Sequence, residues 1–270
     1  MSSSVKVIIL QTAGTNCDGE TAFAFTQCGA EVKLVHINQL IRNERQLKDY
    51  HILAIPGGFS YGDDIAAGRI LANELRLKLA EDIKQFIGEG KLIIGICNGF
   101  QVLVKAGILP GTNDNEKNRS GHFTQEATLT TNDSARFEDR WVYLKPEGRC
   151  VWTMGIKNLI YLPVAHGEGK FVAWDESIPK RLKAHDQIVF RYCSPPGGSP
   201  RYPENPNGSL QDIAAITDES GRILGLMPHP ERHFLGTHHP RWTRLEKESE
   251  YGDGAGILVN GINYAKEKFL

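Results

Sequence analysis

The sequence lacks the features that mark several common classes of protein. Its 270 residues carry a formal net charge of −1, and charges of both signs are mixed along the chain. This balance argues against a dedicated binder of nucleic acid or of a membrane surface. There is no internal repeat and no apolar run long enough to span a membrane, and the first residues do not resemble a signal peptide. We therefore expect a cytoplasmic globular protein that binds neither nucleic acid nor membrane.

The sequence also has little that predicts a disulfide framework or a metal site. Its five cysteines are odd in number and widely spaced, without a CxxC pair, which is typical of reduced cytosolic thiols. His233, His238 and His239 are close in sequence, but their spacing forms no known chelate. We expect these histidines to lie in a solvated loop, and we predict no metal site.

The first 107 residues alternate between strand-like and helix-like patterns. Short apolar runs predict strands over 5–10, 31–37, 51–55 and 91–96. Between and after them, helices are expected over 19–28, with Asp18 as N-cap, over about 65–87, and from Phe100 onward. This alternation favours a doubly wound, mostly parallel sheet with flanking helices. In such sheets the functional site lies at the carboxyl ends of the strands.

The second half of the chain is different, because helical periodicity is poor until the last residues. Strand-like runs occupy 122–131, 141–144, 159–165, 170–174 and 188–193, and a hairpin is predicted from 213–217 and 222–227. Residues 195–207 are rich in proline and glycine and predict a long surface loop, and a final helix is expected over 256–269. These strands have no separate core pattern, so we predict that antiparallel strands extend the same sheet. The interpretation is one domain over residues 1–270, with an insertion-like segment at about 113–154.

One strand-like run ends at a cysteine. Residues 92–96 have the composition of a buried strand, and Cys97 follows directly before a helical pattern. The spacing Gly95-x-Cys97-x-Gly99 matches a nucleophile elbow with sulfur in place of the serine hydroxyl. The positive end of the following helix favours the thiolate. The alternative is a buried cysteine that serves packing alone.

A histidine near the C-terminal end has the residue types needed to activate that thiol. His229 has the right pKa for a general base, and Glu231 can point the same way in an extended segment. Proline on both sides of His229 restricts its backbone. The alternative is an ordinary proline-rich turn with exposed polar residues.

Two glycines follow the strand predicted at 51–55. Such a pair lets backbone amides approach a ligand, so the N–H groups of Gly58 and Asn98 could form an oxyanion hole. The alternative is a tight turn without a catalytic role. Taken together, the cysteine elbow, the His-x-Glu pair and the glycine turn predict thiol-based acyl transfer or amide hydrolysis.

The chain resembles the class I, triad-type glutamine amidotransferases, and more narrowly the glutaminase subunit of phosphoribosylformylglycinamidine synthase. The resemblance spans nearly the whole chain in the order of the family. Its segments are PGGFSYGD at 56–63, GICNGFQ at 95–101, PVAHGEG at 163–169, NPNGS at 205–209 and MPHPER at 227–232. It implies a flavodoxin-like class I amidotransferase fold.

The resemblance implies a role for each motif. Cys97 attacks the side-chain carbonyl of glutamine, His229 moves the proton, and Glu231 orients His229. Glutamine is expected to bind at Gly57, Phe59 and Gln101. His166 and Glu168 are expected either to line the glutamine pocket or to contact a partner, although a strand-end turn is the simpler interpretation.

The resemblance also implies partners. The ammonia is expected to pass to a synthetase subunit, which uses ATP to convert formylglycinamide ribonucleotide to formylglycinamidine ribonucleotide. A small bridging subunit is also expected in the complex. The sequence has no GxxxxGK[ST] loop, so ATP and magnesium are expected in the synthetase partner and no cofactor is expected in this chain. Two other classes stay open from the residues alone: a peptidase-like or deglycase-like enzyme with a cysteine elbow, and a non-catalytic subunit of the same fold.

Overall fold

The computed structural model describes residues 4–111, 123–245 and 249–270. Its strands are β1 (Lys6–Gln11), β2 (Glu31–His36), β3 (Ile52–Ile55), β4 (Leu92–Ile96), β5 (Ala127–Thr130), β6 (Glu138–Pro146), β7 (Ile160–His166), β8 (Lys170–Ala173), β9 (Ile188–Cys193), β10 (Ile213–Thr217) and β11 (Ile223–Leu226). Its helices are α1 (Asp18–Gln27), α2 (Ile37–Ile41), α3 (Arg69–Lys78), α4 (Ala80–Gly88), α5 (Asn98–Lys105), α6 (Ser177–Ala184) and α7 (Ala255–Phe269).

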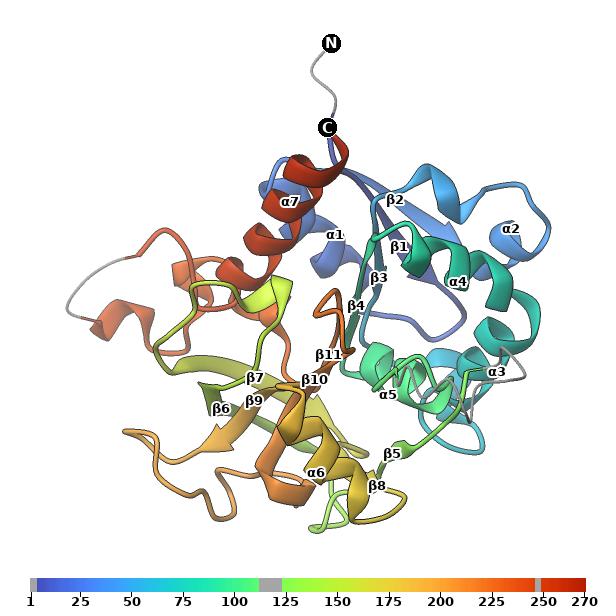
Figure 1. Cartoon of the computed structure of the whole chain (residues 1–270). Helices are drawn as coiled ribbons and strands as arrows, with labels where there is room; N and C mark the ends of the chain where they lie inside the picture. The colour runs from blue at the N-terminus through green and yellow to red at the C-terminus, as the bar shows by residue number, and fades with distance from the viewer. Residues whose placement is uncertain (1–3, 112–122, 246–248) are drawn as a thin grey trace.

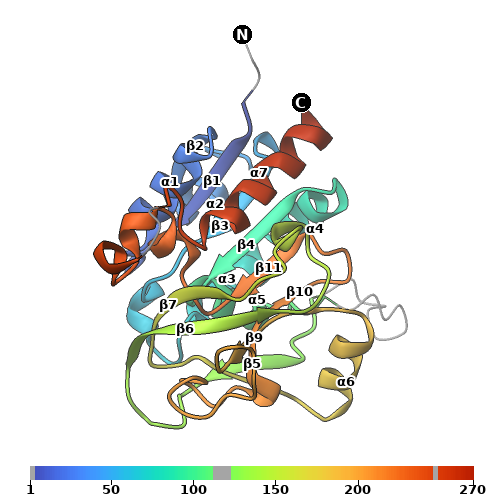
Figure 2. The same cartoon turned by 90° about the vertical axis from the view of Figure 1, so that its left-hand side faces the viewer.

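Within these residues a nine-stranded sheet has the order β2-β1-β3-β4-β11-β10-β9-β6-β7 (Figures 1 and 2). The five strands from β2 to β11 are parallel, and the pairings from β11 to β7 are antiparallel. The prediction of a parallel sheet extended by antiparallel strands is therefore confirmed. Strands β5 and β8 form a separate two-stranded sheet.

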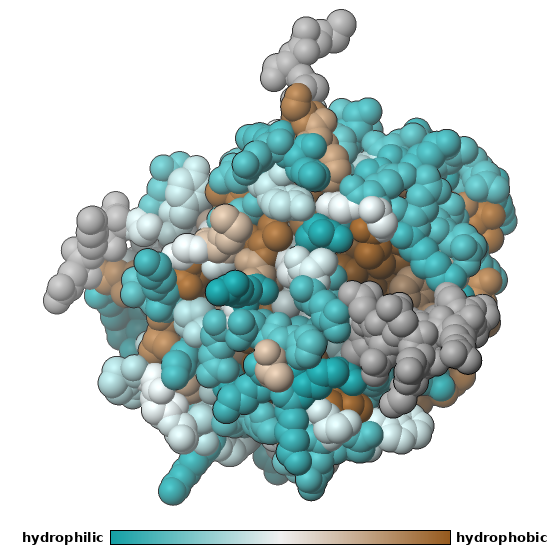
Figure 3. All heavy atoms as spheres, in the orientation of Figure 1, coloured by the Kyte–Doolittle hydropathy of each residue, from teal (hydrophilic) through white to brown (hydrophobic). Residues whose placement is uncertain are grey.

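The parallel half is covered on both faces. Helices α1 and α7 lie against one face, and α3, α4 and α5 lie against the other (Figure 1). Strands covered in this way read as continuous apolar runs, and every residue of β3 and β4 is buried. Outside the core, hydrophilic side chains cover most of the face seen in Figure 3. No helix of the described residues is both long and apolar enough to cross a membrane.

Two local predictions in the first half are wrong. The helix expected over about 65–87 is two helices, α3 and α4, separated at Leu79, whose φ of −124° is not helical. Leu75, Leu79 and Ile83 are all buried, so the apolar periodicity continues through the break and could not reveal it. Asp18 is the first residue of α1 and not its N-cap, which is Cys17. The Asp18 carboxylate accepts a hydrogen bond from Gln11 instead.

The second half differs from the prediction mainly in its boundaries. Helix α6 was not predicted, because its short sequence buries few apolar side chains. The strand expected over 122–131 begins at Ala127, and residue 122 lies outside the described residues. In the insertion-like segment 113–154, residues 113–122 also lie outside them, and the remainder supplies β5 and β6. The single-domain interpretation stays a prediction.

The sheet brings four chain segments to one edge. Because β1, β3, β4 and β11 are parallel, their carboxyl ends reach the same side of the molecule. The residues that follow these strands begin at positions 12, 56, 97 and 227. All the motifs that we expect to be catalytic start there.

Candidate active site

Cys97 occupies a strained turn between β4 and α5. Its φ of 51° and ψ of −104° lie outside the regions that side chains usually adopt, as expected of a nucleophile elbow. The glycines on either side allow this turn. An ideal Cβ on Gly99 would lie 1.9 Å from Ile55 O, and one on Gly95 would lie 2.6 Å from Gly99 O. The Cys97 N–H donates to Leu226 O at 2.8 Å, which fixes the turn to β11.

His229 and Glu231 follow β11 and face each other. His229 Nδ1 lies 2.6 Å from Glu231 Oε1, and both side chains are almost completely buried. The His229 N–H donates to Pro163 O at 2.9 Å, which holds the segment against β7. Burial lowers the pKa of His229, but the charges of Glu231 and Cys97 outweigh it and raise this pKa well above its usual value.

Cys97 and His229 both pack against Gly57. An ideal Cβ on Gly57 would lie 2.8 Å from His229 Cε1 and 3.4 Å from Cys97 Cβ. The Cys97 thiol donates to Ala165 O at 3.6 Å, and among the described residues His229 Nε2 is buried without a hydrogen-bond partner. This nitrogen is therefore available to the thiol. Such catalytic contacts commonly tighten when substrate binds.

The glycine turn is held in place by the loop that follows β1. Gly58 has a φ of 136°, and its backbone pairs with Thr15. The Cys17 N–H donates to Gly57 O at 3.2 Å, and the Phe59 N–H donates to Gly14 O at 2.9 Å. This clamp fixes the backbone of the glycine turn, in which Gly57 packs against Cys97.

The start of α5 supplies the other predicted oxyanion donor. Phe100 and Gln101 N–H both donate to Cys97 O, whereas the Asn98 N–H lies in the first turn, where a helix leaves its amides unpaired. The Asn98 side chain has a different role. It accepts from Ser60 N at 3.3 Å and donates to Asp63 Oδ1 at 3.0 Å. It therefore ties the glycine turn to the helix that follows the nucleophile.

The other residues predicted to bind glutamine, Gln101 and Phe59, differ in burial. Gln101 is buried and both ends of its amide are engaged, since it accepts from Asn98 Nδ2 at 2.9 Å and donates to Glu168 O. Phe59 is 44% exposed, and its ring lies 6.3 Å from that of Phe137, which is 53% exposed. Gln101 thus joins α5 to the segment that follows β7, and Phe59 lies at the surface beside the glycine turn.

His166 and Glu168 lie in different surroundings. His166 is buried between Asn132 Oδ1, 3.2 Å from its Nδ1, and Asn207 Nδ2, 3.4 Å from its Nε2. Burial and the charge of His229 lower the pKa of His166 to about 4, so its ring is neutral. Glu168 is partly exposed and accepts from Ala67 N at 3.3 Å.

Sequence reasoning missed Lys105, Cys17 and Arg232. Lys105 is buried on α5, where its Nζ donates to Ala67 O at 2.6 Å and lies 3.5 Å from Glu168 Oε2. Cys17 Sγ accepts from Arg232 at 3.1 Å, beside the triad. The position of Cys17 soon after β1 indicates that it lies at the edge of the sheet that holds the site. Its contact with Arg232, far away in the sequence, could not be predicted from a local pattern.

The solvated loop predicted for the three histidines is wrong for His233. Its side chain is buried, with Nδ1 2.7 Å from Tyr161 O. Its ring lies 5.0 Å from that of Trp141 and 5.6 Å from that of His239. Aromatic packing against β6 and β7 thus accounts for this position.

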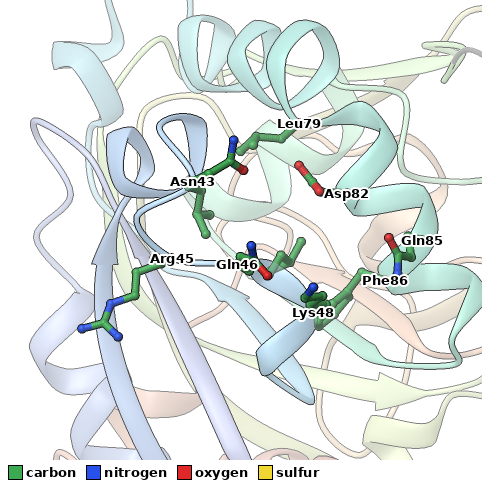
Figure 4. Close-up of a pocket in the computed structure, with 10 residues that line it drawn as sticks. Asn43, Arg45, Gln46, Lys48, Leu79, Asp82, Gln85 and Phe86 are labelled. Carbon is green, nitrogen blue, oxygen red and sulfur yellow. The ribbon is translucent and has the colours of Figure 1, made fainter.

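A separate cavity of about 150 Å³ lies between α4 and the segment that precedes β3 (Figure 4). Its walls include Gln46, Lys48, Asp82 and Gln85. It contains none of the predicted catalytic residues.

The chain matches the family described as the CobB/CobQ-like glutamine amidotransferase domain over residues 4–265. It is 52% identical over 269 residues to phosphoribosylformylglycinamidine synthase subunit PurQ of Dehalococcoides mccartyi, covering 98% of this chain and 99% of that protein. It is 42% identical to the Archaeoglobus fulgidus PurQ subunit, covering 97% and 98% of the two chains.

A similar fold is found in the solved structure of PurLQS from Thermotoga maritima. The matching chain has a TM-score of 0.71 and 30% identity, with 97% of this chain and 99% of that chain covered. A glutamine amidotransferase from Thermotoga maritima, with 14% identity and a TM-score of 0.57, shares the fold. The chain belongs to the glutamine amidotransferase family and, within it, to the PurQ subunits of phosphoribosylformylglycinamidine synthase.

Proposed function

We propose that this chain is the glutaminase subunit of phosphoribosylformylglycinamidine synthase and that Cys97, His229 and Glu231 form its catalytic triad. The assignment of these residues rests on one observation. A strained cysteine elbow lies at the same edge of the sheet as a buried His–Glu pair, in which His229 Nδ1 is 2.6 Å from Glu231 Oε1. A packing role for Cys97 would need neither the strain nor the charge pair.

In the proposed reaction the Cys97 sulfur attacks the side-chain carbonyl carbon of glutamine. The carbonyl oxygen becomes an oxyanion, which the N–H groups of Gly58 and Asn98 stabilise. His229 takes the thiol proton and gives it to the leaving nitrogen, so ammonia departs and a thioester remains. Water, deprotonated by His229, then attacks the thioester and releases glutamate.

Glu231 has two tasks in this scheme. Its carboxylate fixes the His229 tautomer with the proton on Nδ1, and it stabilises the imidazolium that forms during proton transfer. The raised pKa of His229 supports this role, because the carboxylate favours the charged ring. Asn98 and Gln101 act through their side chains as positioning residues.

We further propose that the ammonia passes to a synthetase subunit, in a cytoplasmic complex that also contains a small bridging subunit. The Thermotoga maritima relative was solved as part of PurLQS, which supports such an assembly. ATP and magnesium would bind the synthetase, which converts formylglycinamide ribonucleotide to formylglycinamidine ribonucleotide. The exposed pair Phe59 and Phe137, next to the glycine turn, would lie at the interface with that partner.

The test is release of glutamate from glutamine, measured for the chain alone and with the synthetase, small subunit, ATP and formylglycinamide ribonucleotide. Strong release in the full mixture is expected, and Cys97→Ala should abolish it while ammonia-dependent synthesis continues. Cys28→Ala is the matched control, since Cys28 lies at the far end of α1. Glutamine-dependent turnover that survives Cys97→Ala would show that the triad is assigned wrongly.

A further inference from the structure

Two residues of the triad and two residues at the start of α1 together offer a set of metal-type ligands. Cys17, Glu20, His229 and Glu231 each offer one ligand atom, and these four atoms lie within 4.8 Å of one another. Cys17 and Glu20 come from the start of α1, whereas the other two residues follow β11. We propose that this cluster is a binding site for a zinc-type divalent cation and that occupation of the site switches off the glutaminase.

The chemistry of the four ligands favours zinc. A thiolate, an imidazole and carboxylates are the donors that zinc prefers, and the ligand atoms of a tetrahedral zinc lie roughly 3–4 Å apart. The four atoms here need small side-chain movements to reach that spacing. Cys17, His229 and Glu231 are buried, so they provide a rigid base, while Glu20 lies at the rim.

Two buried polar atoms in the cluster have no partner among the described residues. They are Glu231 Oε2 and His229 Nε2, in side chains that are 0% and 2% exposed. Catalysis explains the free nitrogen, since it serves Cys97. It does not explain the second carboxylate oxygen, because Nδ1 occupies Oε1 alone. A buried carboxylate oxygen without a partner is costly, and a cation would satisfy it.

Arg232 now supplies positive charge at the outer side of the cluster. Its guanidinium lies 3.1 Å from Cys17 Sγ and 2.8 Å from Glu20 Oε1. The Arg232 side chain is 33% exposed and can turn out to solvent. Arginine and metal therefore compete for the same two ligands, so removal of the arginine should strengthen metal binding.

Metal binding would block proton transfer whichever ring nitrogen is used. A neutral imidazole has one nitrogen lone pair that can accept a proton. A metal on Nε2 occupies that lone pair directly. A metal on Nδ1 leaves the proton on Nε2, the nitrogen that should accept the proton of Cys97. This inhibition rests on the proposed glutaminase function, whereas binding itself does not.

The first experiment is calorimetric titration of zinc sulfate into the wild-type chain and three variants. Wild type and Cys97→Ala should each bind one zinc ion, because the nucleophile is not a ligand. Cys17→Ser should weaken binding on the order of a hundredfold, since a lost ligand costs at least as much as a lost supporting contact. Cys28→Ser, a cysteine substitution at the opposite end of α1, should bind like wild type.

The site is overturned if Cys17→Ser binds zinc as tightly as wild type while its circular dichroism is unchanged. Loss of binding in Cys97→Ala together with full binding in Cys17→Ser would instead assign zinc to the nucleophile. Either result contradicts the proposal without reference to activity. Failure of the glutaminase assay alone would contradict the proposed function and leave the zinc titration readable.

Two further measurements sharpen the test. Arg232→Met should bind zinc at least several-fold more tightly than wild type, and equal or weaker binding would contradict the competition with arginine. Cobalt(II) should give sulfur-to-metal charge-transfer absorption in Cys97→Ala and lose it in Cys17→Ser. In the assembled complex, zinc should reversibly inhibit glutamate release but spare ammonia-dependent synthesis, and a chelator should restore activity.

Discussion

His229 Nδ1 and Glu231 Oε1 are joined across 2.6 Å in a part of the molecule that water barely reaches. One residue, Pro230, separates them in the sequence, and the proline on each side of His229 limits the conformations that place them together. A buried carboxylate beside a histidine fixes the tautomer and stabilises the charged ring. Substitution of either member of this pair therefore tests whether His229 activates the Cys97 thiol.

Glu231→Gln should lower kcat for glutamine hydrolysis by roughly 10²–10⁴-fold with little change in KM, because the amide keeps the shape but cannot stabilise the imidazolium. Steady-state glutamate release by the assembled complex is the measurement. Glu89→Gln, an exposed substitution at the end of α4, is the control and should leave kcat unchanged. A kcat within threefold of wild type would remove Glu231 from the triad.

The raised pKa of His229 should make folding stability fall with increasing pH. A group whose pKa is higher in the folded state stabilises that state fully below its unfolded pKa, near 6.5 for histidine. This contribution is lost as pH rises through the higher folded pKa, because the folded state binds more protons in that interval.

The measurement is the free energy of unfolding in urea, for wild type and His229→Asn, at several pH values from about 6 upward. The advantage of wild type over the variant should shrink as pH rises, and other titrating groups cancel in the difference. A difference that stays flat or grows with pH would show that the His229 pKa is not raised.

Gly58→Ala should disable the oxyanion turn. An ideal Cβ at this position would lie 2.7 Å from Asn16 N and 2.9 Å from Gly14 O, and neither backbone atom can rotate away. We expect a loss of more than about a hundredfold in kcat, the size seen when an oxyanion donor is removed.

Gly62→Ala is the matched control for that substitution. Gly62 lies in the same loop with a φ of 72°, but its nearest atom is 3.9 Å from the ideal Cβ. It should lose about 1–2 kcal/mol of stability and keep most of its activity. Equal activity losses in the two variants would mean that general loosening of the loop, and not the position of the Gly58 N–H, decides activity.

Lys105→Met should weaken glutamine binding, although we do not expect the Lys105 side chain to contact the substrate. Lys105 Nζ joins α5 to Ala67 O and to Glu168, and Gln101 donates to the backbone of Glu168. Its loss removes the Nζ donor to Ala67 O, so we expect about 1–3 kcal/mol less stability and a KM raised more than kcat is lowered. Lys78→Met, at an exposed ion pair, should change stability by less than about 1 kcal/mol. Equal urea midpoints for the two variants would contradict this role.

The sequence predicts the parallel half of the fold well for a physical reason. Strands such as β3 and β4 are covered on both faces, so they appear as unbroken apolar runs between glycine-rich turns. The edge where Cys97, Gly58 and His229 meet follows from parallel strand direction. The break at Leu79 does not, because a buried leucine satisfies the helical pattern whether or not the helix is continuous.

The surroundings of the triad are harder to predict from sequence. In the sequence, Lys105 has the pattern of an exposed polar residue at the end of a helix. Tertiary contacts instead bury it against Ala67 and Glu168. In the sequence, Arg232 directly follows the His-Pro-Glu motif. Its contact with Cys17 joins two segments that lie far apart in the sequence. Such contacts depend on how distant loops meet, and no local pattern encodes them.

The position of β11 has a consequence for synthesis of the chain on the ribosome. This strand pairs with β4 in the middle of the sheet, yet it is made from Ile223–Leu226, long after β4 has emerged. Until then the outer edge of β4 has no strand to pair with, and unpaired apolar edges promote aggregation. We therefore expect the nascent chain to expose this edge until β11 has been made, and the turn at Cys97, whose N–H donates to Leu226 O, to be completed only then.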